Sequence, residues 1–413
     1  MAQAQTYTLE QCREMALRHD EDLQKAGISV ERAELDKQVA FSNYLPSLDG
    51  SLGGLVMKEI DLSGTKLLLQ GTYLAGITLT QPIFVGGKIY NGNKLAKVGK
   101  QVAEEQLRAR RQQCIADVDK AYYSLVSVKE KVKMLEKLQA QLDTIMSQVN
   151  TSVAAEMATS ADALRVQTKK SEIEYNLEKA RNGESLCRMV LCSATGLDLS
   201  TPIEVVEPSQ PAESMAMSAD ISLRPEVAML HSAIEAKQLQ VKMAKADLMP
   251  TVALTMGYTY YGNIKMKGVV AGPDGQYYPY EQKMKDGIPM AMLSVQVPIF
   301  HWGTFKKIKQ AKLDVQSAQL DLQKNERLMT IEAEQAIKNV EDARRMINTA
   351  TMGQKQADEN LRVMRLRYDA QMATLTDLLD AESQWQQAHA NLIEAETQYL
   401  INKTEYLRVT GQL

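Results

Sequence analysis

Large aromatic side chains and net charge are both scarce in this chain of 413 residues. It contains only 4 Phe and 2 Trp, and its formal net charge is −3. A protein that binds nucleic acid usually carries a strongly basic surface, so this balance argues against nucleic acid as a partner. Charged residues make up 24% of the chain. With so few aromatics, this composition is typical of long helices rather than of one large aromatic core.

The sequence also lacks the residue patterns that hold a metal ion, a cofactor or a catalytic nucleophile. No CxxC pair occurs and the histidines are dispersed, the residues being Cys12, Cys114, Cys187, Cys192, His19, His231, His301 and His389. We therefore expect buried or idle thiols rather than a zinc or redox site. No phosphate-binding loop or nucleophile elbow occurs either. The chain is therefore expected to be no enzyme, to bind no cofactor and to have no metal site built from cysteine or histidine.

Residues 1–5 contain neither the basic region nor the apolar region of a secretory signal peptide. The chain is therefore either cytoplasmic or a mature sequence from which a signal peptide is absent. Composition does not separate these alternatives, but the strands described next favour the mature form.

Four stretches almost free of charge alternate between apolar and small or polar residues, at 47–57, 67–87, 251–260 and 288–299. The second is long enough to cross a bilayer as a helix, but glycine and proline interrupt it. Its alternate residues form an apolar face, and threonines and glycine form the opposite face. The apolar face consists of Tyr73, Ala75, Ile77 and Leu79. Lipid outside and water inside produce this pattern in transmembrane barrels. We predict four membrane strands, with Asp49 as the one charge on the water face.

Long helices without proline are predicted after each pair of strands. From residue 88 to about residue 150, apolar residues recur at spacings of three and four, which predicts a left-handed coiled coil. At 1.5 Å per residue this helix is about 90–100 Å long. A turn at 154–159 precedes a returning helix that ends at Gly196, the predicted C-cap. A shorter helix is predicted from the capping box of Thr8 and Gln11 to about Phe41.

The order of two strands followed by two helices occurs twice in the chain. The equal offsets indicate this repeat, since Met157 corresponds to Met372 and Gly196 to Gly411, each 215 residues later. The second pair of strands has the longer loop, at about 262–287. Both copies pass from strand to helix at a Pro-Ile-Phe sequence. The expected junction residues are Pro82, Phe84, Gly87, Pro298, Phe300, Trp302 and Gly303. We expect proline to end each strand and glycine to permit a tight crossover.

These patterns divide the chain into seven expected segments. Two pairs of strands are expected at 47–83 and 251–299, and two long helical hairpins at 84–196 and 300–413. The remaining segments are a first helix with part of an equatorial region at 1–46, an extended equatorial linker at 197–220 and a helix at 221–250. The expected fold class is therefore mixed, with all-α hairpins joined to a membrane β-barrel.

Four strands are too few to close a membrane barrel, because the smallest closed transmembrane barrels have eight. An open sheet edge in lipid would leave backbone groups without hydrogen bonds. Other copies of the chain must therefore complete the barrel, and two, three or four copies would supply 8, 12 or 16 strands. Such a barrel joined to a long helical tube would be a conduit.

The doubled layout, the two Pro-Ile-Phe junctions and the two hairpin turns resemble those of the TolC-like outer membrane factors, over essentially the whole chain. The resemblance implies a homotrimer in outer-membrane lipid, with a 12-stranded barrel and a periplasmic α-helical barrel. It also implies a periplasmic adaptor protein at the helical tips and, through it, an inner-membrane transporter. The expected function is the exit duct of a tripartite efflux pump. The alternatives are the exit duct of type I protein secretion and, in another class, a non-conducting coiled-coil scaffold or adhesin stalk.

The resemblance also assigns roles to the two turns. It places the periplasmic aperture or gate at Asp162, Tyr368, Asp377 and Asp380, and the adaptor contact at Glu156, Met157, Ala158, Thr159, Gln371, Met372, Ala373 and Thr374. The family commonly has glycine where this chain has Glu156 and Gln371, and some members have a gate arginine at the position of Ala373.

Helix capping is the alternative role for two of these carboxylates. Thr159 with Asp162, and Thr374 with Asp377, both have the spacing of a capping box. Asp380 lies one turn further along and has no such role. Because Asp377 and Asp380 share a helix face, a trimer would present a ring of six carboxylates, which we expect to favour cations and to bind divalent ions.

Overall fold

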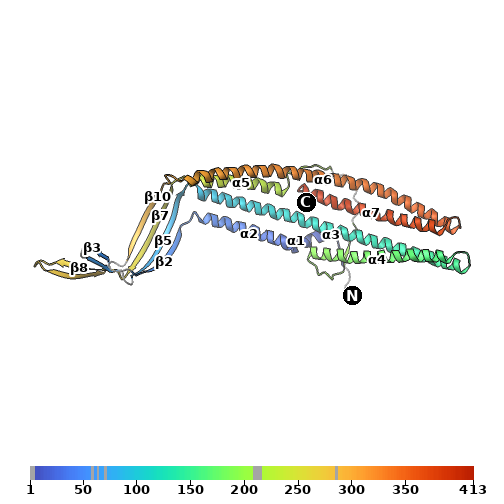
Figure 1. Ribbon diagram of the computed structural model, residues 1–413, viewed down its shortest axis with the longest axis horizontal. Helices are drawn as coiled ribbons and strands as arrows, with labels where there is room; N and C mark the ends of the chain where they lie inside the picture. Colours follow the sequence, from blue (N-terminus) through green and yellow to red (C-terminus); the bar gives the residue numbers. More distant parts are fainter. Residues whose placement is uncertain (1–4, 57–59, 63–64, 69–71, 208–215, 284–286) are drawn as a thin grey trace. The chain divides into compact units, whose positions relative to one another are not determined.

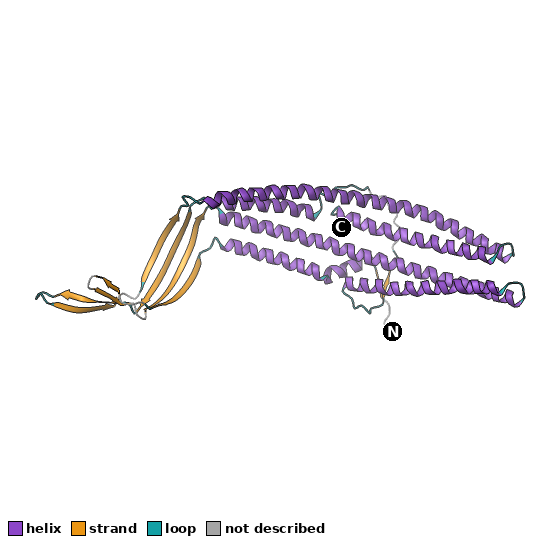
Figure 2. Cartoon of the chain, viewed as in Figure 1, coloured by secondary structure: helices purple, strands orange, loops and turns teal. Residues whose placement is uncertain are grey.

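The computed structural model describes residues 5–56, 60–62, 65–68, 72–207, 216–283 and 287–413. Within these ranges the chain has seven helices and ten strands. They form two compact units, one of residues 1–30, 103–230 and 321–413, the other of residues 31–102 and 231–320. Figure 1 labels the elements, and Figure 2 distinguishes helices from strands.

The second unit contains an antiparallel sheet built from all four predicted membrane strands. These are β2 (Ser47–Leu55), β5 (Thr72–Val85), β7 (Thr251–Gly262) and β10 (Ile288–Gln296), in the order β10-β7-β5-β2 (Figure 1). Strands from the two repeats therefore pair directly, through β5 and β7. Within this sheet, β10 and β2 are the two open edges.

The register places the apolar and polar residues on opposite faces of this sheet, as predicted. One row across the strands is Leu48, Leu79, Met256 and Ala291, and the next row is Asp49, Thr78, Gly257 and Met290. Because neighbouring residues of a strand point to opposite faces, the two rows belong to different faces. The polar face also carries Met290 and Met292, for which the sequence pattern predicts no face.

A second antiparallel sheet replaces part of the loop predicted at 262–287. It contains β3 (Ile60–Leu62), β4 (Thr65–Leu68), β8 (Lys265–Ala271) and β9 (Tyr277–Lys283). In this part of the predicted loop, Lys265 and Lys267 both form ion pairs with Glu281 across β8 and β9, at 3.1 and 3.2 Å. Gly275, with φ of 77°, permits the turn between these strands.

The two strand-to-helix junctions differ from each other. The prediction that proline ends the strand is wrong for the first copy, because β5 continues through Pro82 to Val85 with an irregular register between Pro82 and Phe84. The pairing of β5 with β2 stops at Thr80, so no strand on that side needs the N–H that proline lacks. In the second copy β10 ends at Gln296, two residues before Pro298.

Glycine has the predicted role in the first junction only. Gly86 and Gly87 have φ of 61° and 83°, which suits glycine far better than other residues. A Cβ on Gly86 would lie 2.6 Å from the carbonyl oxygen of Ala246, the last residue of α5 (Pro225–Ala246). Gly303, by contrast, lies in the first turn of α6 (Trp302–Asp369) with open space around it.

The first unit contains the free ends of two long helical hairpins (Figure 2). The first hairpin is α3 (Lys88–Ala154) with α4 (Ser160–Thr195), and the second is α6 with α7 (Leu375–Val409). Gly196 caps α4 with φ of 72°, as predicted. A buried apolar cluster, which includes Leu135, Leu138, Leu361 and Leu378, joins the two hairpins. None of the helices in the described ranges combines the length and the apolar character that a membrane-spanning helix needs.

The predicted first helix is two helices, α1 (Leu9–His19) and α2 (Glu21–Ser42). The chain changes direction at Asp20, whose extended backbone ends α1. The carboxylate of Asp20 also accepts a hydrogen bond from the N–H of Leu23 and forms an ion pair with Arg110 at 2.7 Å. The break therefore comes from a capping carboxylate rather than from glycine or proline, which makes it hard to see in the sequence.

The expected linker at 197–220 contains one short strand. This strand, β6 (Ile203–Val205), pairs in parallel with β1 (Gln5–Tyr7) near the start of the chain. Tyr122 of α3 donates a hydrogen bond from its hydroxyl to the carbonyl of Val206 at 2.6 Å. Residues 208–215 of the linker lie outside the described residues.

Candidate functional site at the helical tips

The turns at the ends of the two hairpins have the same backbone structure. Glu156 and Gln371 occupy equivalent positions with left-handed φ values of 58° and 57°. The next residue in each turn donates an N–H five residues back, from Met157 to Ser152 at 2.8 Å and from Met372 to Arg367 at 2.7 Å. This pattern is the Schellman motif, in which glycine is the usual left-handed residue. The resemblance to glycine-containing turns therefore has a conformational basis.

Both returning helices begin with a complete capping box. The N–H of Thr159 donates to Asp162 at 3.2 Å, and the N–H of Asp162 donates to the hydroxyl of Thr159 at 3.3 Å. Thr374 and Asp377 make the same pair of bonds at 2.9 and 3.2 Å. The bonds from threonine lower the pKa of both carboxyl groups below the ordinary value. The capping alternative is therefore observed for Asp162 and Asp377, and it keeps both carboxylates ionised.

One turn further along, the two returning helices α4 and α7 carry opposite charges at equivalent positions of the repeat. Asp380 is exposed, and its counterpart 215 residues earlier is Arg165. Arg165 donates a hydrogen bond to the hydroxyl of Thr376 at 2.9 Å and lies 3.9 Å from Asp162. The first tip therefore carries a compensated pair, while the second carries two carboxylates, Asp377 and Asp380. The link from Arg165 to the second hairpin was missed in the sequence, where only its spacing from Asp162 hinted at it.

A groove of about 790 Å³ lies between the two tips. It brings together many of the predicted tip residues, and its lining includes Met157, Ala158, Asp162, Tyr368, Gln371, Ala373 and Thr374. Burial raises the pKa of Tyr368, and the nearby charges of Asp162 and Asp369 add to this effect, so its hydroxyl stays neutral. Asp377 and Asp380 are not part of the lining.

A buried ion pair lies behind the tips. Glu382 of α7 is fully buried and accepts a hydrogen bond from Arg365 of α6 at 3.0 Å. Its second oxygen has no hydrogen-bond partner among the described residues. Burial raises the pKa of Glu382, and Arg365 opposes this shift. The sequence did not predict this pair, because a glutamate within a charged helix carries no sign of being buried.

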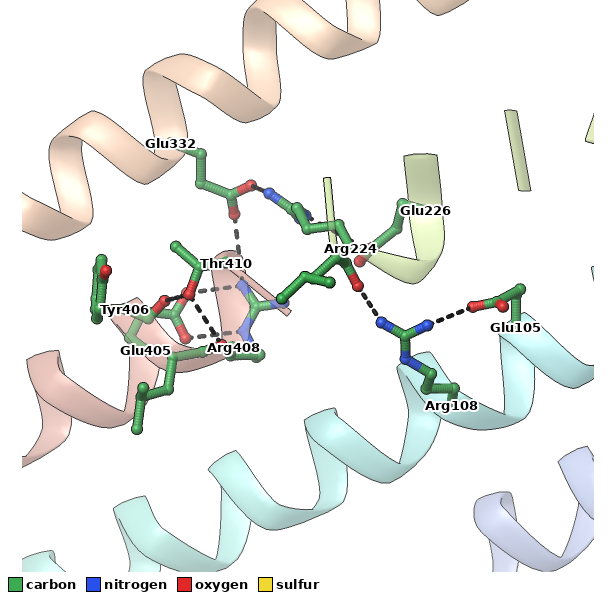
Figure 3. Close-up of polar contacts among 11 residues, drawn as sticks. Glu105, Arg108, Arg224, Glu226, Glu332, Glu405, Tyr406, Arg408 and Thr410 are labelled. Atoms are coloured by element: carbon green, nitrogen blue, oxygen red, sulfur yellow. Dashed lines mark hydrogen bonds and ion pairs between the residues drawn. The ribbon is translucent and has the colours of Figure 1, made fainter. Parts of the chain in front are cut away.

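A second polar network lies where α7 ends (Figure 3). Arg224, only 5% exposed, forms ion pairs with Glu332 at 2.6 Å and with Glu226 at 3.3 Å. Arg408 contacts the same Glu332 at 3.4 Å and Glu405 at 2.7 Å. These bonds fasten the end of the chain to α6 and to the start of α5.

The sequence profile of the outer membrane efflux protein family matches residues 12–183 and 218–412. The chain belongs to this family. It is 22% identical over 394 residues to outer membrane efflux protein BepC of Brucella suis, covering 94% of this chain and 81% of the relative. It is 20% identical over 411 residues to the proteases secretion protein PrtF of Dickeya chrysanthemi, covering 94% and 84%.

Solved structures show the same fold. The Campylobacter jejuni CmeC outer membrane channel matches with a TM-score of 0.81 and 18% identity, covering 98% of this chain and 85% of that one. The outer membrane protein VceC of Vibrio cholerae matches with a TM-score of 0.81 and 17% identity, covering 98% and 96%. The predicted family and mixed fold class are therefore confirmed. This member of the outer membrane efflux protein family is an outer-membrane exit channel and not an enzyme.

Proposed function

We propose that this efflux family member works as a homotrimer whose strands form a 12-stranded barrel in outer-membrane lipid. The observation that carries the proposal is the four-stranded sheet with one apolar face, one polar face and two open edges, β10 and β2. Unpaired edges are costly in lipid, where each unsatisfied backbone group costs several kcal/mol. Pairing β10 of one copy with β2 of the next satisfies both edges.

The long helices then form the periplasmic part of the duct, and the tips receive a periplasmic adaptor coupled to an inner-membrane transporter. Exposed Met157 and Met372 support this role, because each lies at the apex of a turn and methionine adapts readily to a partner surface. Asp162, Tyr368, Asp377 and Asp380 are the proposed gate residues. The equatorial region is proposed for the β1 and β6 pair, residues 197–220 and the end of α7.

Small molecules are the proposed cargo, because the family is named for efflux. Protein export is the second candidate, since PrtF is named a proteases secretion protein. Crosslinking from Met157 and Met372 in cells, followed by identification of the captured adaptor, distinguishes a drug pump from a secretion system.

Conductance in a planar bilayer tests the duct, with two neighbouring residues as a matched pair. Ile77 is on the apolar face and Thr78 on the polar face of β5. Arginine facing lipid near the bilayer centre costs about 2–4 kcal/mol, so Ile77→Arg is expected to abolish insertion. Thr78→Arg is expected to insert and to conduct with weaker cation preference.

The parent protein, purified in detergent, is expected to have the mass of a trimer and to form ion-conducting pores. A monomer that needs no detergent and never conducts would instead support the scaffold or stalk alternative. Equal conductance of Ile77→Arg and Thr78→Arg would contradict the assignment of the two faces.

A further inference from the structure

A row of large apolar side chains lies exposed on α4. Leu164, Tyr175 and Leu186 are 62, 71 and 63% exposed, and each is eleven residues from the next. Eleven residues make three turns of an α-helix, so the three side chains lie along one face. Nothing within a single copy of the described chain covers them, although apolar surface of this kind is normally buried against a partner.

The internal repeat shows what this row does in the second hairpin. Its counterparts 215 residues later are Leu379, Ala390 and Ile401 on α7. Leu379 and Ala390 pack against the buried cluster that contains Leu135 and Leu138 of α3. Ile401 packs against a second buried cluster, whose buried members all come from the first half of the chain. The second hairpin therefore uses this row to pack on the first hairpin.

The surface that would receive the α4 row is also present. The counterparts of Leu135 and Leu138 are Ala350 and Gly353 on α6. These two residues, with Ala388 and Ala395 of α7, help to line a groove of about 700 Å³. Within one copy, the small Ala390 packs against the buried cluster that contains these large residues of α3. At the groove, small residues on α6 take the place of the large residues on α3. The small residues on α6 and α7 leave a space that a large side chain could fill.

We propose that Tyr175 of one copy inserts into the groove at Ala350 and Gly353 of the next copy. The proposal rests on the homotrimer proposed above and names the contact that joins its helical parts. Tyr175 follows Thr159 by as many residues as Ala390 follows Thr374, so with the tips level Tyr175 lies at the height of the groove. This contact of α4 with α6 of the next copy is equivalent in the repeat to the packing of α7 on α3 within one copy. The large residue lies on α4 and the small residues lie on α6.

Charge supports the same alignment. Lys179, one turn beyond Tyr175, is the counterpart of Glu394, which lines the groove. Both side chains are exposed, and neither forms an ion pair within the described part of the chain. With Tyr175 in the groove, Lys179 of one copy and Glu394 of the next lie at the same height and have opposite charges.

Crosslinking of the full chain in detergent tests the contact. Cys187, the one cysteine that is not fully buried, is replaced by serine, and Tyr175→Cys is combined with Gly353→Cys. A short thiol-reactive bifunctional reagent is expected to give a ladder of crosslinked dimers and trimers. The matched control joins Tyr175→Cys with Lys355→Cys, an exposed position of α6 about 200° around the helix, and is expected to remain monomeric after denaturation.

A size exchange supplies the second measurement. Gly353→Leu fills the groove and Tyr175→Ala removes the side chain that enters it, so each variant alone is expected to lower the temperature at which the trimer dissociates. The double variant places leucine at 353 and alanine at 175, the residue types that the repeat has at Leu138 and Ala390. It is expected to recover the dissociation temperature.

The outcomes separate this contact from the proposed duct. A trimer by light scattering that conducts, yet fails to crosslink at Tyr175 and Gly353, would overturn the contact and leave the duct intact. Absence of a trimer in the parent protein would overturn both. Additive losses in the double variant would also contradict the insertion of Tyr175.

Discussion

Glu156 and Gln371 hold the left-handed conformation at the two tips with φ of 58° and 57°. This conformation costs residues with a Cβ about 1 kcal/mol relative to glycine. We expect Glu156→Gly and Gln371→Gly each to raise the stability of the tips by up to about 1 kcal/mol, measured as a higher midpoint of thermal unfolding. Ala155→Gly, next to the turn, is the control and is expected to lower the midpoint. A lower midpoint for the tip variants would contradict the observed turn geometry.

Glu382 gives the stability of the tips a pH dependence. Burial raises its pKa above the ordinary value of 4.5, so the folded protein binds this proton more tightly than the unfolded chain does. Its contribution is therefore fully present below pH 4.5 and is lost as pH rises through the folded pKa.

We expect Glu382→Gln to flatten this dependence, so that the variant gains in unfolding temperature over the parent most clearly above the folded pKa. Arg365 is partly exposed, so water hydrates its guanidinium group once the ion pair with Glu382 is lost. The measurement is thermal unfolding by circular dichroism from pH 4 to pH 8. Glu359→Gln, which changes an exposed carboxylate whose pKa is lowered by Arg362, should not reproduce the gain.

At the scale of elements, the first junction depends on close contact between the end of β5 and the end of α5. A Cβ on Gly86 would meet the backbone of Ala246 at 2.6 Å and the side chain of Met249 at 2.7 Å. We expect Gly86→Ala to destabilise the folded protein by about 1–2 kcal/mol or more, because both the φ and the contact forbid the added carbon.

Gly303→Ala is the matched control for that prediction. It lies in a helical turn with open space, and alanine is favoured over glycine there by up to about 1 kcal/mol. The two variants are compared by the yield of folded oligomer and its unfolding temperature. Equal losses in both would show that the two junctions work alike, contrary to their geometry.

The elements that could be predicted were those with a regular period. The alternation in 67–87 and the spacing of three and four after residue 88 predicted a strand followed by a long helix, and the structure has β5 at Thr72–Val85 and α3 at Lys88–Ala154. Boundaries set by distant partners could not be predicted. β5 passes through Pro82 because its pairing with β2 stops at Thr80, and β8 pairs with β9 along seven positions of the predicted loop.

At the tips, too, only the local contacts could be predicted from the sequence. Capping boxes are local, so Thr159 with Asp162 and Thr374 with Asp377 were visible as spacings. Arg165 meets Thr376 of the other hairpin, far away in the sequence. Glu382 is fully buried and pairs with Arg365 of the facing helix. Neither contact has a local pattern, because each depends on which helices pack together.

At the scale of the whole channel, the proposed trimer would bring three copies of Asp377 and Asp380 to one aperture. At the first tips, Asp162 lies near Arg165, which partly offsets its charge. We expect Asp377→Asn with Asp380→Asn to weaken the block of current by divalent cations in a planar bilayer. Asp162→Asn is the control and is expected to keep the block. Unchanged block in the double variant would exclude the carboxylate ring as the binding site.

The parallel pairing of β1 with β6 has a consequence for the order in which the protein folds. Gln5 lies opposite Ile203, roughly two hundred residues away, and contacts of such large sequence separation form slowly. The earliest strand of the chain must wait for half of the polypeptide before it finds its neighbour. We therefore expect this small pair to form late in folding, after the helices of the first hairpin between its two strands.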